Sequence, residues 1–360
     1  MNGSARLSDL ASLVRSLKAP ISAIAQDTSS FIVGDSEGTV SAWSVLDGAH
    51  LWSIEVEPSV SSIAVADNIV AIAHGASITG INYDDGAVIW ANSVEGACDL
   101  VAFDEQSLWV TSSVYEIEIQ DYVACRIMRI EPRQGLVEQS IPLASKAWTL
   151  DIFGRGCILG LGRPQPGIYT LQIGQDGLKH LEGTPRIPII RSSTSSDNRI
   201  SFTTSDYQAI QIDQTGEILN LEKDVLLAGF RHDGKWTRYS ERGEVDNQKN
   251  QPEGFDEIPY HFTSNDEMTL ISTNKPESSG VISLGKTRMN WTHSSEITIV
   301  QSYLDRTILG CLDGEIFLLE NKVIKRRIKK PEILSQDDSS VRARLRMLRS
   351  VDLRDTMEEK

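Results

Sequence analysis

Two stretches of the chain, residues 42–52 and 80–90, match each other without a gap. Each contains an Asp-Gly pair and, four residues after the glycine, a tryptophan. The spacing is constant, because Asp47, Gly48 and Trp52 each lie 38 residues before Asp85, Gly86 and Trp90. Asp-Gly pairs between short apolar runs are typical of tight turns that join antiparallel strands. The chain is therefore built from a repeat of about 40 residues that consists of strands and turns.

This repeat predicts a β-propeller, in which each blade is a small sheet of four short strands. The first unit has apolar runs at 31–34, 39–43 and 51–54, separated by turn sequences. Later units drift but keep a final hairpin with a glycine turn, at Gly135, Gly177 and Gly216. We predict an all-β fold of seven blades, or of six if the degraded unit at 225–245 is left out of the count.

Three segments are expected along the chain. Residues 1–19 are predicted to form an amphipathic helix, because Leu7, Leu10 and Leu13 recur at three-residue steps before Pro20. We expect this helix to pack on the side or one end of the propeller, with docking to another protein as the alternative. Residues 20–330 form the propeller, and residues 331–360 are predicted to form a basic helical tail.

The hairpins at 45–52 and 83–90 resemble the tryptophan-docking repeats of the quinoprotein-like propeller superfamily. In that motif the tryptophan fills a gap between neighbouring blades, which implies a structural docking role for Trp52, Trp90 and Trp291. The repeat is also similar to WD-repeat propellers, although their Gly-His and Trp-Asp dipeptides are absent from this sequence. The quinone enzymes of the superfamily often carry adjacent cysteines, which this chain lacks. The resemblance therefore implies a non-catalytic, protein-binding member without a cofactor.

The charge is divided unevenly along the chain. Residues 20–321 contain 20 basic and 42 acidic residues, whereas residues 322–360 contain 12 basic and 7 acidic residues. An acidic body repels nucleic acid and anionic membrane, so a phosphate-bearing partner would have to use the basic end. For the cationic run Lys322–Lys330 we expect an edge strand that also neutralises an acidic surface, with a protein-docking helix and a nucleic-acid or lipid contact as alternatives. The candidate partner-binding residues in the tail are Arg342, Arg344, Arg346 and Arg349.

The sequence shows no constellation that indicates catalysis or a metal site. The six histidines do not form a metal-binding pair such as His-x-His. The glycine-rich stretch 154–162 lacks the Gly-Lys-Ser/Thr of a phosphate loop, and calcium binding by turn aspartates is the weaker interpretation of those residues. The four cysteines are scattered, so we expect free, mostly buried thiols and a cytoplasmic protein: Cys98, Cys125, Cys157 and Cys311.

We therefore predict a non-catalytic scaffold that binds protein partners through its propeller surfaces and terminal helices. A further candidate contact surface is the charged loop Glu241–Glu257. Two alternatives stay open: a ligand-binding or enzymatic propeller with a site at the channel mouth, and association with nucleic acid or an anionic surface through the tail.

Overall fold

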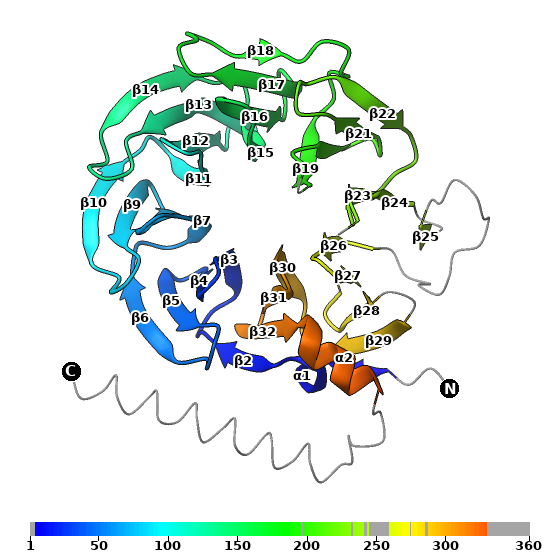
Figure 1. The fold of residues 1–360 in the computed structure, drawn as a ribbon. Helices are drawn as coiled ribbons and strands as arrows, with labels where there is room; N and C mark the ends of the chain where they lie inside the picture. The colour runs from blue at the N-terminus through cyan, green and yellow to red at the C-terminus, as the bar shows by residue number, and fades with distance from the viewer. Residues whose placement is uncertain are drawn as a thin grey trace.

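A computed structural model gives the fold and describes residues 4–195, 197–231, 233–240, 243–244, 259–273, 275–284 and 287–329. Small antiparallel sheets follow one another around a central axis (Figure 1). We number them as blades 1 to 8 in chain order. Blade 1 consists of β3 (Ile21–Gln26), β4 (Ser30–Asp35), β5 (Thr39–Ser44) and β6 (His50–Glu55). Blade 2 consists of β7 (Val60–Ala66), β8 (Ile69–His74), β9 (Ser77–Asn82) and β10 (Val88–Ser93). Blade 3 consists of β11 (Ala97–Phe103), β12 (Leu108–Glu116), β13 (Asp121–Ile130) and β14 (Val137–Pro142).

The second half of the ring continues this order and ends with strands from the N-terminus. Blade 4 consists of β15 (Ala147–Ile152), β16 (Gly156–Leu161), β17 (Gly167–Gln172) and β18 (Lys179–His180). Blade 5 consists of β19 (Ile189–Thr194), β20 (Ile200–Thr204), β21 (Ala209–Ile212) and β22 (Ile218–Glu222). Blade 6 consists of β23 (Leu227–Phe230), β24 (Trp236–Ser240) and β25 (Gly243–Glu244). Blade 7 consists of β26 (His261–Ser264), β27 (Met268–Ser272), β28 (Ser278–Leu284), β29 (Thr287–His293) and the N-terminal strand β1 (Ala5–Arg6). Blade 8 consists of β30 (Ile297–Tyr303), β31 (Arg306–Cys311), β32 (Glu315–Glu320) and the N-terminal strand β2 (Leu13–Ser16).

The predicted all-β propeller with short terminal helices is confirmed. The described residues form seven sheets of four or five strands and an eighth, blade 6, with three. Contacts between the innermost strands run once around the ring and close between β30 and β3. The ring therefore holds eight sheets, one more than the seven expected, and the degraded unit at 225–245 is a blade of its own, blade 6.

The core lies between the faces of neighbouring blades. The second strand of most blades is buried along its whole length, as in β8 and β31, because a sheet packs against both of its faces. Branched aliphatic side chains fill these layers, and they suit a pleated strand that is covered on both sides. Each interblade boundary thus forms its own small apolar cluster, for example Ala25, Ile32, Ile63 and Ile72 between blades 1 and 2.

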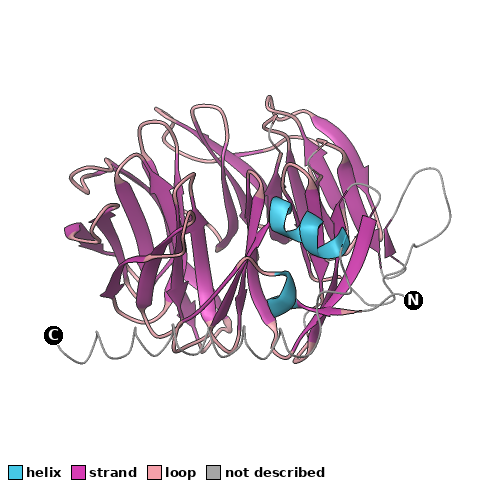
Figure 2. Ribbon diagram, turned by 60° about the horizontal axis from the view of Figure 1, so that its bottom comes forward, coloured by secondary structure: helices cyan, strands magenta, loops and turns pink. Residues whose placement is uncertain are grey.

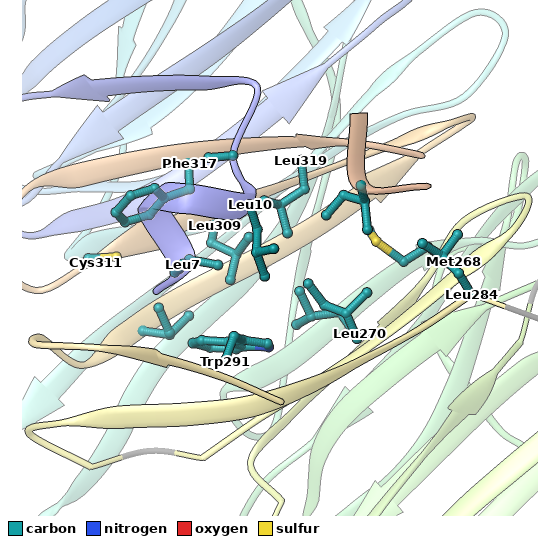
Figure 3. Close-up of a cluster of buried hydrophobic side chains, with 14 residues drawn as sticks. Leu7, Leu10, Met268, Leu270, Leu284, Trp291, Leu309, Cys311, Phe317 and Leu319 are labelled. Carbon is teal, nitrogen blue, oxygen red and sulfur yellow. The ribbon is translucent and has the colours of Figure 1, made fainter. Parts of the chain in front are cut away.

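The predicted N-terminal helix is wrong over most of its length. Within residues 4–19, which the structure describes, only α1 (Leu7–Leu10) is helical, and Leu13–Ser16 form β2, which pairs antiparallel with β32. The leucine spacing fits a helix, but the open edge of blade 8 supplies backbone hydrogen bonds that only a strand can use. The expected packing on the propeller is found, since Leu7 and Leu10 are fully buried against Trp291 and blade 8 (Figure 3).

The predicted edge strand at Lys322–Lys330 is also wrong, because Asn321–Lys329 forms the helix α2. Both helices lie side by side on the outside of the ring (Figure 2). The Arg327 guanidinium donates hydrogen bonds of 2.7 Å to the carbonyl oxygens of Asp9 and Ala11, at the end of α1. A cation at a helix C-terminus satisfies carbonyl groups that lack a partner within the helix. Residues 331–360, with the predicted tail helix, lie outside the described residues.

Candidate partner-binding surface

The tryptophans of the repeat contact the blade that follows their own. Trp52 in β6 donates a hydrogen bond of 2.7 Å from Nε1 to the Tyr83 carbonyl oxygen of blade 2. Trp90 in β10 makes the same bond, at 2.6 Å, to the Pro132 carbonyl oxygen of blade 3. Each indole lies directly over the glycine of the next turn, since a Cβ on Gly135 would sit 2.6 Å from the Trp90 ring. This is the geometry that the docking motif implies, while its weight in stability stays a prediction.

Other residues take the indole's place at later boundaries. Gln139, four residues after Gly135, donates a hydrogen bond of 2.7 Å to the Gln175 carbonyl oxygen of blade 4. Leu181, four residues after Gly177, lies against Gly216 in the turn of blade 5. Trp291 is fully buried but contacts α1 and blade 8, and its Nε1 has no hydrogen-bond partner. The docking position thus continues around the ring after the tryptophan has been lost.

At the last boundary the N-terminal strand β2 takes this position. Arg15 donates a hydrogen bond from Nη2 to the Gly48 carbonyl oxygen in the Asp-Gly turn of blade 1, and Leu13 lies against the same glycine. The outer strand of blade 8 therefore docks on blade 1 in the way that β6 docks on blade 2. These residues belong to the structure of the ring, which leaves its ends and loops available for function.

The candidate binding residues named from the sequence fall mostly outside the described part of the chain. This holds for the four arginines of the tail, Arg342, Arg344, Arg346 and Arg349, and for nearly all of the loop Glu241–Glu257. Of the cationic run that precedes the tail, Lys325 forms an ion pair with Glu267 in blade 7. This ion pair fits the expectation that the run neutralises the propeller's own acidic surface, whereas Arg327 contacts backbone carbonyl groups.

A surface that was not singled out from the sequence is the hairpin of β12 and β13. β12 has nine residues where β8 has six, so the hairpin extends three residues further, or about 10 Å at the rise of a strand. Its tip exposes Tyr115, Ile117 and Ile119, and the two isoleucines are 78% and 60% exposed. Exposed aliphatic residues at this density are typical of a binding surface rather than of a solvated loop.

An aromatic strip continues from the hairpin onto blade 4. The Tyr115 and Tyr122 rings lie 5.1 Å apart, and the Tyr122 and Trp148 rings lie 5.9 Å apart, both edge to face. Lys146 places its ammonium group 4.3 Å from the centre of the Tyr122 ring. Edge-to-face and cation–π contacts of this kind hold large side chains in fixed positions. The strip therefore gives the exposed tip a rigid base.

A partly buried ion pair fixes this base. The Lys146 ammonium lies 2.6 Å from Asp99 Oδ1, and Ser113 donates a hydrogen bond of 2.6 Å to Oδ2 of the same carboxylate. Both carboxylate oxygens thus have partners, which offsets the partial loss of water around this charge. The charge of Lys146 is neutralised here, whereas Glu116 and Glu118 at the tip are exposed. The hairpin surface, which we define as Tyr115–Tyr122 with Trp148, therefore combines apolar side chains with net negative charge.

The four cysteines are free and buried, as expected. Burial is the main cause that raises the pKa of Cys98, Cys157 and Cys311 far above the ordinary value of a thiol. Burial likewise raises the pKa of Cys125 to about 11. Thiols in this state are protonated at neutral pH and are poor nucleophiles.

An open cleft of about 540 Å³ lies between the turns of blades 2 and 3. Its lining combines polar residues such as Asp67, Asn68, Asp104 and Glu105 with apolar residues such as Ile69, Ile89 and Phe103. It lies at the interblade boundary and not at the mouth of the central channel, where the alternative ligand site was expected. Asp104 accepts hydrogen bonds from the backbone N–H groups of Gln106 and Ser107, so it stabilises its own turn. The cleft therefore has the character of a surface groove between loops.

The ring of blades and its interblade docking define a β-propeller protein. Among solved structures, the chain is similar to the computationally designed protein Ika8, with a TM-score of 0.66 and 15% identity over 85% of this chain and 98% of the other. It is also similar to Sqt1 of Saccharomyces cerevisiae, with a TM-score of 0.66 and 9% identity over 86% of this chain and 98% of the other. A third similar structure is the WD40 β-propeller domain of Doa1, with a TM-score of 0.55 and 12% identity over 86% of this chain and 96% of the other.

Identities this low show the fold alone, and they confirm the resemblance to WD40-like propellers at that level. Comparison with protein families and with curated proteins gives no match. In the described part of the chain, helices long and apolar enough to span a membrane are absent.

Proposed function

We propose that this propeller is a non-catalytic scaffold that binds a protein partner through the hairpin surface. The observation that carries the proposal is the exposure of Ile117 and Ile119 at the tip of a hairpin that extends beyond its blade. An aliphatic tip on a rigid aromatic base has the composition of an interface centre with a charged rim.

The chemistry of the surface specifies the partner. Apolar anchors separated by Glu116, Glu118 and Asp121 complement a segment that carries both aliphatic and basic side chains. Such a segment buries its apolar residues on the isoleucines and places its cations beside the carboxylates. Nucleic acid and anionic lipid are disfavoured here by the negative charge. We also propose a cytoplasmic location, which the four free thiols support.

The test is a quantitative capture of proteins from native lysate with four forms of the full chain, each partner then being purified and titrated singly. The forms are the wild type, the double variant I117S/I119S, the control L46S and a variant that ends at Lys330. Leu46 is 95% exposed in the β5–β6 turn, so L46S removes an equally exposed aliphatic side chain elsewhere. We expect a stoichiometric partner that I117S/I119S alone loses, by about 100-fold in affinity if the two isoleucines are central.

Charge gives a second readout of the same surface. The variant E116Q/E118Q should weaken binding and flatten its dependence on salt, because exposed charge pairs are screened. A partner that is lost from the variant ending at Lys330 and retained by I117S/I119S would move the binding site to the tail. Equal binding by all four forms would reject the hairpin surface.

A further inference from the structure

A second group of side chains lies where blade 7 meets blade 8. His293 is the last residue of β29, Cys311 is the last residue of β31, and Asp313 lies in the turn before β32. The three donor atoms, a histidine ring nitrogen, the Cys311 Sγ and an Asp313 carboxylate oxygen, all lie within 4.8 Å of one another. Residues 18 and 20 positions apart in the sequence thus converge through the packing of two sheets.

The histidine is the member of this group that needs an explanation. Its side chain is only 7% exposed, and Nε2 is buried without a hydrogen-bond partner. The Phe317 ring lies against the imidazole, with ring centres 4.9 Å apart. A buried ring nitrogen without a partner costs free energy unless a proton donor, an acceptor or a metal ion satisfies it.

The distances around Nε2 are longer than hydrogen bonds; they fall within the range of an ion pair with a protonated imidazole, and they also suit a shared metal ion. Asp313 Oδ2 lies 3.7 Å from Nε2, and Glu315 Oε2 lies 3.8 Å from it. In a tetrahedral zinc site with bonds of about 2.0–2.3 Å, ligand atoms are separated by about 3.3–3.8 Å. The carboxylates therefore stand within a few tenths of an ångström of the separations that a metal ion imposes.

The backbone holds the carboxylate and the thiol in these positions. Asp313 Oδ1 accepts a hydrogen bond of 3.1 Å from the Glu315 backbone N–H, which leaves Oδ2 directed towards His293. The Asp313 N–H in turn donates to Ser295 Oγ at 3.2 Å. Cys311 is fully buried in the apolar cluster of blades 7 and 8. Fixed ligands of this kind reduce the ordering that metal binding would otherwise require.

We propose that His293, Cys311 and Asp313 form a zinc-binding site that links blade 7 to blade 8. The donor set of imidazole nitrogen, thiol sulfur and carboxylate oxygen selects Zn²⁺ over Ca²⁺ and Mg²⁺, which prefer oxygen ligands alone. Glu315 is the nearest further carboxylate and the candidate for the fourth position. Binding releases the Cys311 proton to solvent, because the thiolate is the form that binds the metal. The site is structural, since its ligands come from packed strands and a tight turn rather than from an open pocket.

The experiment uses the full chain after treatment with a chelator, titrated with Co²⁺ as a spectroscopic probe and with Zn²⁺ in competition. We expect one equivalent of Co²⁺ to give a thiolate-to-metal charge-transfer band and the visible bands of a tetrahedral ion, both removed by one equivalent of Zn²⁺. Zn²⁺ should also raise the melting temperature. The variants H293Q, C311S and D313N should each lose stoichiometric binding.

The control is C157S, which removes another fully buried thiol in blade 4 and should bind Zn²⁺ like the wild type. D313N keeps the test valid if C311S fails to fold, because the side chain of Asp313 is 40% exposed and its change to an amide should leave the fold intact. A wild-type protein that gives no charge-transfer band, or that binds Co²⁺ no better than D313N does, would overturn the proposal.

Discussion

Replacement of Trp90 measures how strongly one indole holds two blades together. Trp90 is 8% exposed and donates its Nε1 hydrogen to the Pro132 carbonyl oxygen, while its ring covers Gly135. W90F keeps most of the apolar contact but loses the hydrogen bond, which should cost about 1–3 kcal/mol because the carbonyl group loses its partner. W90A also leaves a cavity between the blades and should cost about 3–5 kcal/mol.

Equilibrium unfolding in urea, followed by near-ultraviolet circular dichroism, measures these differences. The control is W148A, which removes an indole that is 45% exposed and should cost about 1 kcal/mol or less. Gly135 provides a coupling test, because a Cβ there would sit 2.6 Å from the Trp90 ring. G135A should therefore destabilise the wild type more than it destabilises W90A. If W90A costs no more than W148A, the indole does not lock the blades.

Three further predictions concern other parts of the molecule. Deletion of residues 1–16 should open the ring, lower the melting temperature and cause association through the bare edge of blade 8, as seen by size-exclusion chromatography, whereas deletion of residues 1–4 should not. Burial, the largest cause, lowers the pKa of His261 to about 4, so the unfolded chain binds more protons between this pH and 6.5. Stability should then be full above pH 6.5 and fall by up to about 3 kcal/mol towards pH 4, with a smaller fall in H261Q. I117S/I119S should unfold within about 0.5 kcal/mol of the wild type, because both side chains are exposed.

The parts of the fold that follow from local chemistry could be predicted from the sequence. The Asp-Gly turns and the tryptophan four residues later identify the last hairpin of blades 1 and 2. Glycine is favoured at Gly48 and Gly86 because φ is +70° and +72° there, a conformation that residues with a Cβ rarely adopt. The number of blades is harder to predict, because blade 6 and the start of blade 7 lie between Gly216 and Gly280, where these signals are missing.

Both terminal segments show how tertiary packing overrides a sequence period. Leu7, Leu10 and Leu13 have helical spacing, yet Leu13 lies in a strand because blade 8 needs an outer partner for β32. The run after Asn321 alternates like a strand but forms α2, which packs on α1. In neither case does the local pattern contain the deciding contact, which comes from residues about 300 positions away.

The binding surface and the metal ligands were missed for a related reason. The sequence does carry a signal for the hairpin, because Glu and Ile alternate over residues 116–119. Alternation of apolar and polar residues predicts a strand with one buried face, however. Here both faces are exposed, because the hairpin extends beyond the neighbouring blades. His293 and Cys311 meet only when two blades pack, so their spacing in the sequence carries no metal-binding pattern.

The pairing of β2 with β32 has a consequence for the order in which the protein folds. Ser12 donates hydrogen bonds to the Leu318 carbonyl oxygen, a partner 306 residues further along the chain. At a synthesis rate of about 5–20 residues per second, that partner leaves the ribosome about 15–60 s later. During this time Leu7 and Leu10 have no apolar surface to bury them, and the growing propeller is an open arc with two unpaired ends. Closure is thus the last step of folding, and chaperone protection of the N-terminal leucines should matter most before blade 8 is complete.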